Sequence, residues 1–126
     1  MKLTTRDIVF LYDTVAKIAN KQDIERAPID VKFLLVRNIR AMQPIYQEFI
    51  DARKKLLLEN STEIEGTADR RATAEQAVYI NNEIEKLEAV EVEIPISSIS
   101  LSKLEALNLD VVELSGLYPI IANEEA

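Results

Sequence analysis

The feature that most constrains the fold is one long apolar stripe in the first half of the chain. Apolar residues recur there at intervals of three and four, the spacing that places side chains on one face of an α-helix. The stripe lasts for about eight helical turns and predicts one long helix, which Asp30 can cap with its carboxylate. Its members are Val31, Leu34, Leu35, Ile39, Met42, Ile45, Tyr46, Phe49, Ala52 and Leu56.

Pro44 lies inside this stripe. A proline lacks a backbone N–H and crowds the carbonyl four residues earlier, here that of Arg40, so we expect a kink in the helix. The alternative is two helices broken near Gln43. The apolar stripe continues on both sides of Pro44, which favours the kink.

Within the stripe, a seam of apolar residues repeats every seven positions, as in a coiled coil. An intermolecular coiled coil and an intramolecular helical hairpin would use the same residues, and we favour the hairpin. The seam consists of Leu35, Met42, Phe49 and Leu56.

A second helix of the hairpin is predicted further along the chain. Residues 60–73 are polar, contain Gly66 and lack periodicity, so we expect a loop. Thr73 and Gln76 have the spacing of a capping box, which marks a helix start. The apolar residues Ala77, Ile80, Ile84 and Leu87 then mark one helical face. Together, residues 30–89 read as an antiparallel helical hairpin.

The first 20 residues predict a separate, shorter helix. Thr4 or Thr5 can cap it, and it should run to about Asn20. The segment KQDIERAPI then reads as a connector that Pro28 brings to an end. The apolar face of this helix consists of Ile8, Leu11, Tyr12, Val15, Ile18 and Ala19.

After residue 89 the apolar period changes from helical to two. Val90, Val92, Ile94 and Ile96 alternate with Glu91, Glu93 and Pro95, which predicts a strand with one apolar and one acidic face. Since Pro95 has no N–H to donate, the strand should lie at an edge or end there. We expect it to pair with Ile99–Leu101 or with another chain.

Short helical turns are predicted for the rest of the chain. Ser102 and Glu105 have capping-box spacing and should open a turn that continues through Leu107. Asp110 can cap a last helix over Val111–Ser115, ended by Gly116 and Pro119. We therefore expect one mainly α domain, 1–126: an N-terminal helix (1–20), the long antiparallel hairpin (30–89), and a short β element with helical turns (90–126).

The composition argues against an enzyme. The chain has no histidine and no cysteine, and its two glycines stand apart, so triads, thiolate chemistry and phosphate-binding glycine loops are all excluded. The serines at 97, 98, 100 and 102 have no nearby base and read as turn and cap residues. Glu83, Glu85 and Glu88 do not converge on one point of a helix, so we expect no catalytic residue, no metal site and no cofactor.

Charge is unevenly distributed along the chain. Residues 1–59 carry 11 Lys and Arg against 8 Asp and Glu, whereas residues 60–126 carry 4 against 14. Either the halves complement each other within the fold, or an acidic surface meets a basic partner or a second copy head to tail. The short run at residues 53–55 reads as a helix C-terminus rather than a nucleic-acid site. No stretch is long and apolar enough for a membrane span or a signal peptide.

Several large or charged side chains are candidates for a partner interface. Phe10, Phe33 and Leu58 point away from the apolar stripes of their helices, and large apolar residues on an outer face often mark interfaces. Glu91 and Glu93 form the acidic face of the predicted strand, which could also add to a sheet of a partner. The competing interpretation is that the N-terminal helix covers Phe33.

The chain resembles a group of small helical-hairpin proteins encoded by tailed bacteriophages. The resemblance rests on the opening MKLTTRDIVFLYDTVAKIAN, the basic apolar segment VKFLLVRNIRAM and the closing run EVEIPISSISLSKLEAL. It implies a non-enzymatic phage protein that acts by protein–protein interaction, as a virion structural or assembly subunit that binds itself or other proteins. The alternative is a small acidic inhibitor that binds a host protein such as a defence or transcription factor. Either role would place the chain in the host cytoplasm or the virion.

Overall fold

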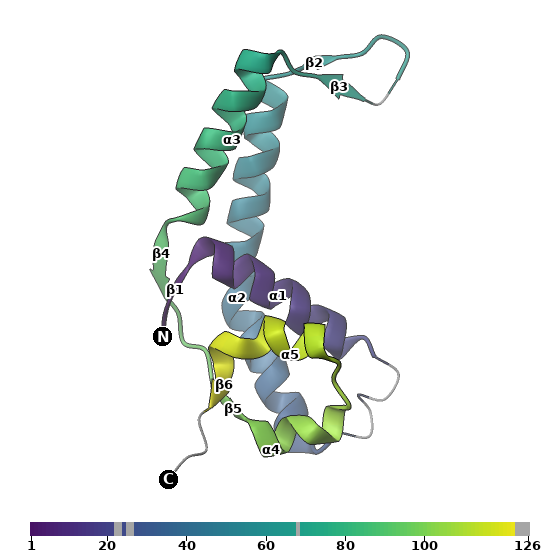
Figure 1. Ribbon diagram of the computed structural model, residues 1–126, viewed down its shortest axis with the longest axis vertical. Helices are drawn as coiled ribbons and strands as arrows, with labels where there is room; N and C mark the ends of the chain where they lie inside the picture. Colours follow the sequence, from purple (N-terminus) through teal and green to yellow (C-terminus); the bar gives the residue numbers. More distant parts are fainter. Residues whose placement is uncertain (22–23, 25–26, 68, 123–126) are drawn as a thin grey trace.

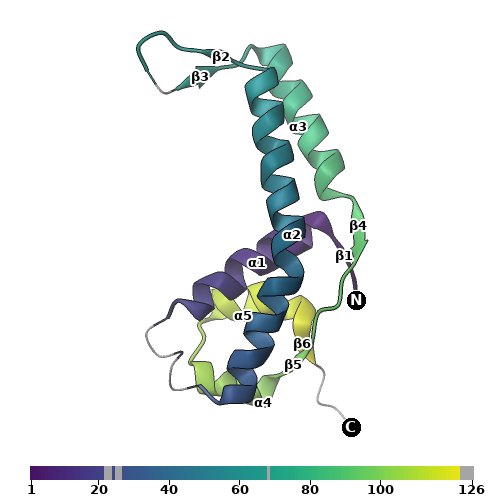
Figure 2. The same ribbon diagram turned by 180° about the vertical axis from the view of Figure 1, so that it is seen from behind.

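The computed structural model describes residues 1–21, 24, 27–67 and 69–122, and its architecture is mainly α, as predicted (Figure 1). Helix α2 (Ile29–Glu59) is the long central helix of the molecule. Helix α3 (Ala74–Glu88) runs back along the second half of α2, and both views show the pair as an antiparallel hairpin (Figures 1 and 2). Parts of the predicted connector (22–23 and 25–26) and residues 123–126 lie outside the described residues.

Helix α2 continues through Pro44 without a break, which rules out the two-helix alternative. The seam faces inward: Leu35, Met42 and Phe49 are buried within this chain, as the hairpin interpretation predicts. The predicted start is wrong, because Pro28 occupies the N-cap position and Asp30 lies inside the first turn. The Asp30 carboxylate accepts a hydrogen bond from the backbone N–H of Val31 instead.

The segment expected to be a loop contains a short antiparallel ladder. Strands β2 (Thr62–Glu63) and β3 (Arg70–Arg71) pair there, and Gly66 takes the positive φ of 80° that favours glycine. The guanidinium of Arg70 donates hydrogen bonds to the backbone oxygens of Leu58 (3.2 Å) and Ser61 (2.8 Å). It thereby satisfies one carbonyl in the last turn of α2, that of Leu58, and one just beyond the helix. Two-residue strands leave no alternating pattern to read in the sequence.

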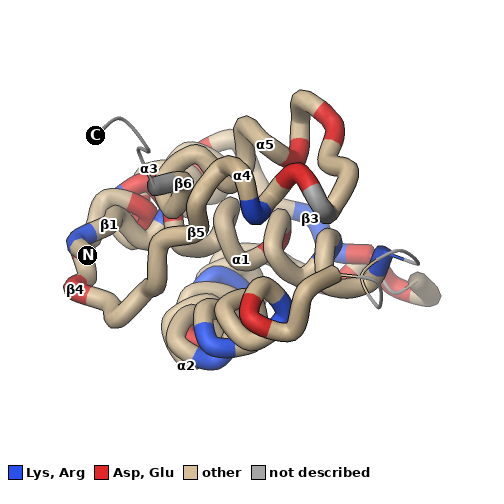
Figure 3. The backbone as a smooth tube through the Cα atoms, turned by 90° about the horizontal axis from the view of Figure 1, so that it is seen from below, with Lys and Arg blue, Asp and Glu red and all other residues tan. Residues whose placement is uncertain are grey.

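Helix α1 (Thr5–Ala19) begins after Thr4, whose hydroxyl accepts a hydrogen bond from the Asp7 N–H. It crosses the first half of α2 and lies between α2 and the C-terminal helices (Figures 1 and 3). Four residues of its apolar face, Ile8, Leu11, Val15 and Ile18, are each 0% exposed, whereas Tyr12 and Ala19 are partly exposed. The core forms where α1, the start of α2 and the C-terminal segment meet.

The pairing predicted for the acidic-apolar strand is wrong. Strand β4 (Glu91–Glu93) pairs antiparallel with β1 (Lys2–Thr4), with Leu3 opposite Val92. The residues just before α1 reach β4 because α1 packs beside α3, and the Thr5 N–H and hydroxyl both donate to the Val90 carbonyl at 2.8 and 2.9 Å. Strand β5 (Ile99–Ser100) pairs in parallel with β6 (Ile121–Ala122) instead.

The C-terminal turns differ in detail from the prediction. Helix α4 (Leu101–Leu104) starts with Ser100, not Ser102, at its N-cap, because the chain leaves the extended β5 there. A 3₁₀ turn over Glu105–Leu107 follows. Helix α5 (Val111–Leu117) has the predicted Asp110 cap, in a complete capping box with Glu113. A 3₁₀ turn over Tyr118–Ile120 leads to β6.

Gly116 lies within α5 rather than ending it. A Cβ atom at this position would lie 2.4 Å from Oγ1 and 2.7 Å from Cγ2 of Thr14 on α1. Real Cβ contacts are not this short, so the close packing of α5 on α1 requires a residue without a side chain here. This packing role, rather than helix termination, explains the glycine.

Candidate protein-interaction surface

The structure leaves the three predicted apolar interface residues exposed but does not place them together. Phe10, Phe33 and Leu58 are 59%, 62% and 48% exposed, so α1 does not cover Phe33. Phe33 and Leu58 lie 25 residues apart on α2, which corresponds to about 37 Å along the helix. Phe10 lies on α1, which packs on the opposite side of α2 from Phe33.

The two acidic candidates form ion pairs across the β1–β4 ladder. Glu91 lies 3.1 Å from the Lys2 ammonium, and Glu93 lies 2.9 Å from the N-terminal ammonium of Met1. Both carboxylates are more than half exposed, so each ion pair contributes little to stability. Their negative charge is nevertheless matched within the chain, which makes them weak candidates for binding a partner.

A contiguous apolar stripe surrounds Phe33. Ile29, Phe33 and Val36 are 81%, 62% and 47% exposed, and their spacing of four and three residues puts them on one face of α2. Leu35 and Met42 point in the opposite direction, into the core. We call Ile29, Phe33 and Val36 the α2 outer stripe. Large side chains at this exposure are what an interface patch presents before its partner binds.

Positive charge flanks the α2 outer stripe. Lys32, Arg37 and Arg40 lie on or beside it, and basic positions are visible along α2 when the molecule is viewed from below (Figure 3). Within the part of the chain that the structure describes, none of the three makes an ion pair or a side-chain hydrogen bond. Asp30, the nearby acid, pairs with Lys103 at 2.8 Å.

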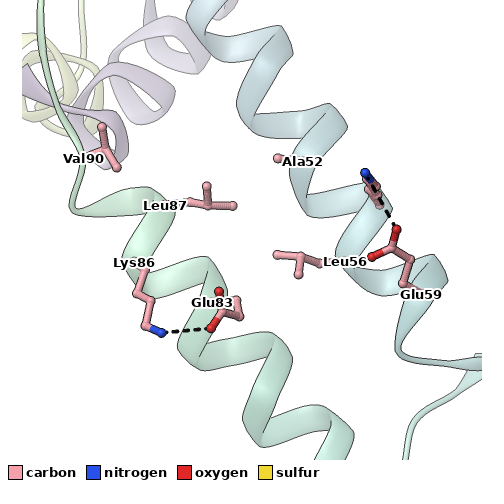
Figure 4. A pocket seen from close by; sticks show the side chains of 8 residues that line it. Ala52, Leu56, Glu59, Glu83, Lys86, Leu87 and Val90 are labelled. Carbon is pink, nitrogen blue, oxygen red and sulfur yellow. Dashed lines mark hydrogen bonds and ion pairs between the residues drawn. The ribbon is translucent and has the colours of Figure 1, made fainter.

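A groove separates the second half of α2 from α3 (Figure 4). It measures about 410 Å³, and Leu56 and Leu87 extend toward one another across it. Ion pairs within each helix line it, Lys55–Glu59 at 3.9 Å and Lys86–Glu83 at 3.0 Å. The groove is open rather than enclosed, and its leucines belong to the hairpin contact, so it is not a shaped ligand site.

The described residues contain no group of three or more Asp, Glu, His or Cys side chains that could hold a metal. Tyr46 stacks on Tyr12 with ring centroids 4.2 Å apart, and burial together with the nearby Asp13 raises the pKa of its phenol. A neutral, stacked phenol of this kind contributes packing rather than acid–base chemistry. No helix in the described ranges is both long and apolar enough to cross a membrane.

Comparison of the chain with protein-family models, with curated proteins and with solved structures finds no match.

Sequence reasoning found Phe33 but missed its neighbours Ile29 and Val36. A signal was present, because these residues form a second apolar spacing on the face opposite the main stripe. The main apolar stripe is much longer, so the short spacing of Ile29, Phe33 and Val36 is not recognised as a separate pattern. The sequence also gave no indication that Glu91 and Glu93 would be paired with the first two residues of the chain.

Proposed function

We propose that this chain is a non-enzymatic subunit that acts by protein–protein contact through the α2 outer stripe. In keeping with its resemblance to phage proteins, we place that contact in the structure or assembly of a virion. The observation that carries the proposal is the exposure of Ile29, Phe33 and Val36 at 81%, 62% and 47% on one helix face. Covering these side chains would stabilise a complex by removing apolar surface from water.

The basic residues beside the α2 outer stripe favour a specific contact over nonspecific hydrophobic association. Lys32, Arg37 and Arg40 have no acidic partner within the described residues, so a partner that supplies carboxylates would be selected over one that does not. Charges around an apolar centre raise the association rate and fix the orientation of the partner.

The proposal is tested by site-specific photo-cross-linking in the cells that make the protein. A photoreactive phenylalanine analogue is placed at Phe33, and a matched control at Glu48, which is exposed about four turns further along the same helix. We expect cross-links to a protein of the assembled particle, or to the chain itself, from position 33 well above those from position 48. Equal cross-linking from both positions, together with absence of the chain from particles, contradicts the proposal.

The acidic inhibitor remains the second candidate. It draws support from the excess of negative charge in residues 60–126, including Glu75 and Glu85, which have no ion-pair partner among the described residues. Binding to a purified host protein that is lost at moderate salt, without any particle association, would favour it over the assembly subunit.

A further inference from the structure

We infer that the occupant of the α2 outer stripe is the outward face of α3 on a second copy of this chain, so that copies associate head to tail. The inference rests on the proposed function and names its partner. It follows from the character of the α3 face, from charge complementarity and from the directions in which the two faces point.

The outward face of α3 combines two exposed apolar or aromatic side chains with acidic and amide side chains. Ile80 is buried against the hairpin, and residues about 140–220° around the helix from it point outward. Val78 is 60% exposed, and Tyr79, at the flank of this face, is 50% exposed. We call Glu75, Val78, Tyr79, Asn82 and Glu85 the α3 outer face.

The charges of the two faces are complementary. Glu75 and Glu85 make no ion pair within the described residues, just as Lys32, Arg37 and Arg40 make none. Two like faces would place uncompensated charges of one sign against each other, which costs free energy. An α2 outer stripe against an α3 outer face instead brings carboxylates to the guanidinium groups. The α2 outer stripe together with Arg40 extends over about three helical turns, as does the α3 outer face, so their lengths match.

The two faces point in opposite directions. Ala52 and Leu56 of α2 line the groove beside α3, and by helical periodicity they share the side of α2 that carries Leu35 and Met42. Helix α3 therefore lies on the side of α2 opposite the outer stripe, and by the same periodicity its own outer face points away from α2. A contact between faces so arranged is heterologous, and it generates rings or open chains rather than a two-fold dimer.

Charge reversal tests the inference without disturbing the fold, because every position changed is exposed. The first variant is Arg37→Glu with Arg40→Glu, and the second is Glu75→Lys with Glu85→Lys. A control, Arg6→Glu with Lys17→Glu, changes the net charge as the first variant does but lies on α1. Absolute mass is measured by light scattering over a range of concentrations, with circular dichroism as the check on folding.

We expect the mass of the wild-type protein to rise with concentration beyond two copies, and the control to behave alike. Each reversed variant alone should self-associate at least about tenfold more weakly than the wild-type protein, because like charges then meet. An equimolar mixture of the two variants should recover the wild-type association, because both contacts in the mixture again join opposite charges.

Three results would overturn the inference. Wild-type protein that is monomeric throughout excludes self-association. A mass that stops at two copies shows a two-fold contact. Normal association by the α3 variant shows that another surface meets the stripe. If the wild-type protein is monomeric but Phe33 still cross-links to another particle protein, the proposed function survives and only this inference fails.

Discussion

The side-chain amide of Asn38 and the backbone of Ser97 exchange two hydrogen bonds. The Asn38 Nδ2 donates to the Ser97 carbonyl at 3.0 Å, and the Ser97 N–H donates to Asn38 Oδ1 at 2.8 Å. Asn38 is 0% exposed and lies on α2, 59 residues before Ser97. This pair attaches the extended segment after β4 to the central helix and positions the C-terminal part of the core.

The Asn38–Ser97 pair should contribute strongly to stability. Asn38→Ala removes both hydrogen bonds and leaves a half-buried N–H and carbonyl of Ser97 without these partners, so we expect the free energy of unfolding to fall by about 1–3 kcal/mol. Urea denaturation followed by circular dichroism measures the change. The control Asn82→Ala, at an exposed position, should change it by less than about 0.5 kcal/mol. Equal effects of the two substitutions would show that the buried pair is not special.

Gly116→Ala should destabilise the packing of α5 on α1. The new methyl group would lie 2.4 Å from Thr14 Oγ1, so the helices must move apart, at a cost of about 1–3 kcal/mol. Thr14→Ala in the same chain removes the two nearest atoms and should recover part of that loss. Additive effects of the two substitutions in thermal melts would mean that these residues do not meet.

Lys21 should be required for the stability of the fold because it neutralises the buried carboxylate of Glu113. The Lys21 ammonium lies 2.6 Å from Glu113 Oε1, and the Glu113 side chain is 6% exposed. Lys21→Met would leave that carboxylate buried without its cation, which we expect to cost about 2–3 kcal/mol. Glu113→Gln in the same chain should restore part of the stability, and a double-mutant cycle by urea denaturation measures the coupling. A coupling near zero would contradict the pair.

The Asp110 cap should make α5 sensitive to acid. Its carboxylate accepts the Glu113 backbone N–H at 2.8 Å, and this hydrogen bond, with smaller contributions from the Glu113 side chain and Lys21, lowers the pKa of Asp110. Because this pKa is lower in the folded than in the unfolded chain, the ionised carboxylate stabilises the fold fully at pH values above the ordinary pKa of an Asp. That stabilisation is lost as the pH falls below about 4. The melting temperature of Asp110→Ala should therefore lie below that of the wild-type protein at pH 7, and the gap should narrow at pH 3. A gap that is constant with pH would exclude a charged cap.

The helices could be predicted because their signals are local. The stripe on α2 and the Thr4, Thr73 and Asp110 caps each act within a few residues, and each is present in the structure. The pairing of β4 with β1 could not be predicted, because it joins residues about 90 positions apart and depends on how α1 crosses the hairpin. In the sequence, Asn38 is one polar residue in a predicted helix. Its structural role depends on the hydrogen bonds to Ser97, which is distant in the sequence.

The interface candidates divide in the same way. Exposure of Phe10, Phe33 and Leu58 follows from helical periodicity, and the structure confirms it. Which of them belongs to a larger patch depends on how the helices pack. Ile29 and Val36 extend the surface around Phe33, whereas Phe10 lies on a different helix, α1.

The central claim is that the α2 outer stripe is a contact surface, and Phe33→Asp tests it most directly. The measurement is the absolute mass in solution, by light scattering during size-exclusion chromatography, for the wild-type protein, Phe33→Asp and the control Phe10→Asp. Both substitutions place the same charge at a similarly exposed phenylalanine. We predict that the wild-type protein and Phe10→Asp have the same mass in solution, above that of a monomer, while Phe33→Asp is monomeric with unchanged helicity. Association of Phe33→Asp at the wild-type level would contradict it.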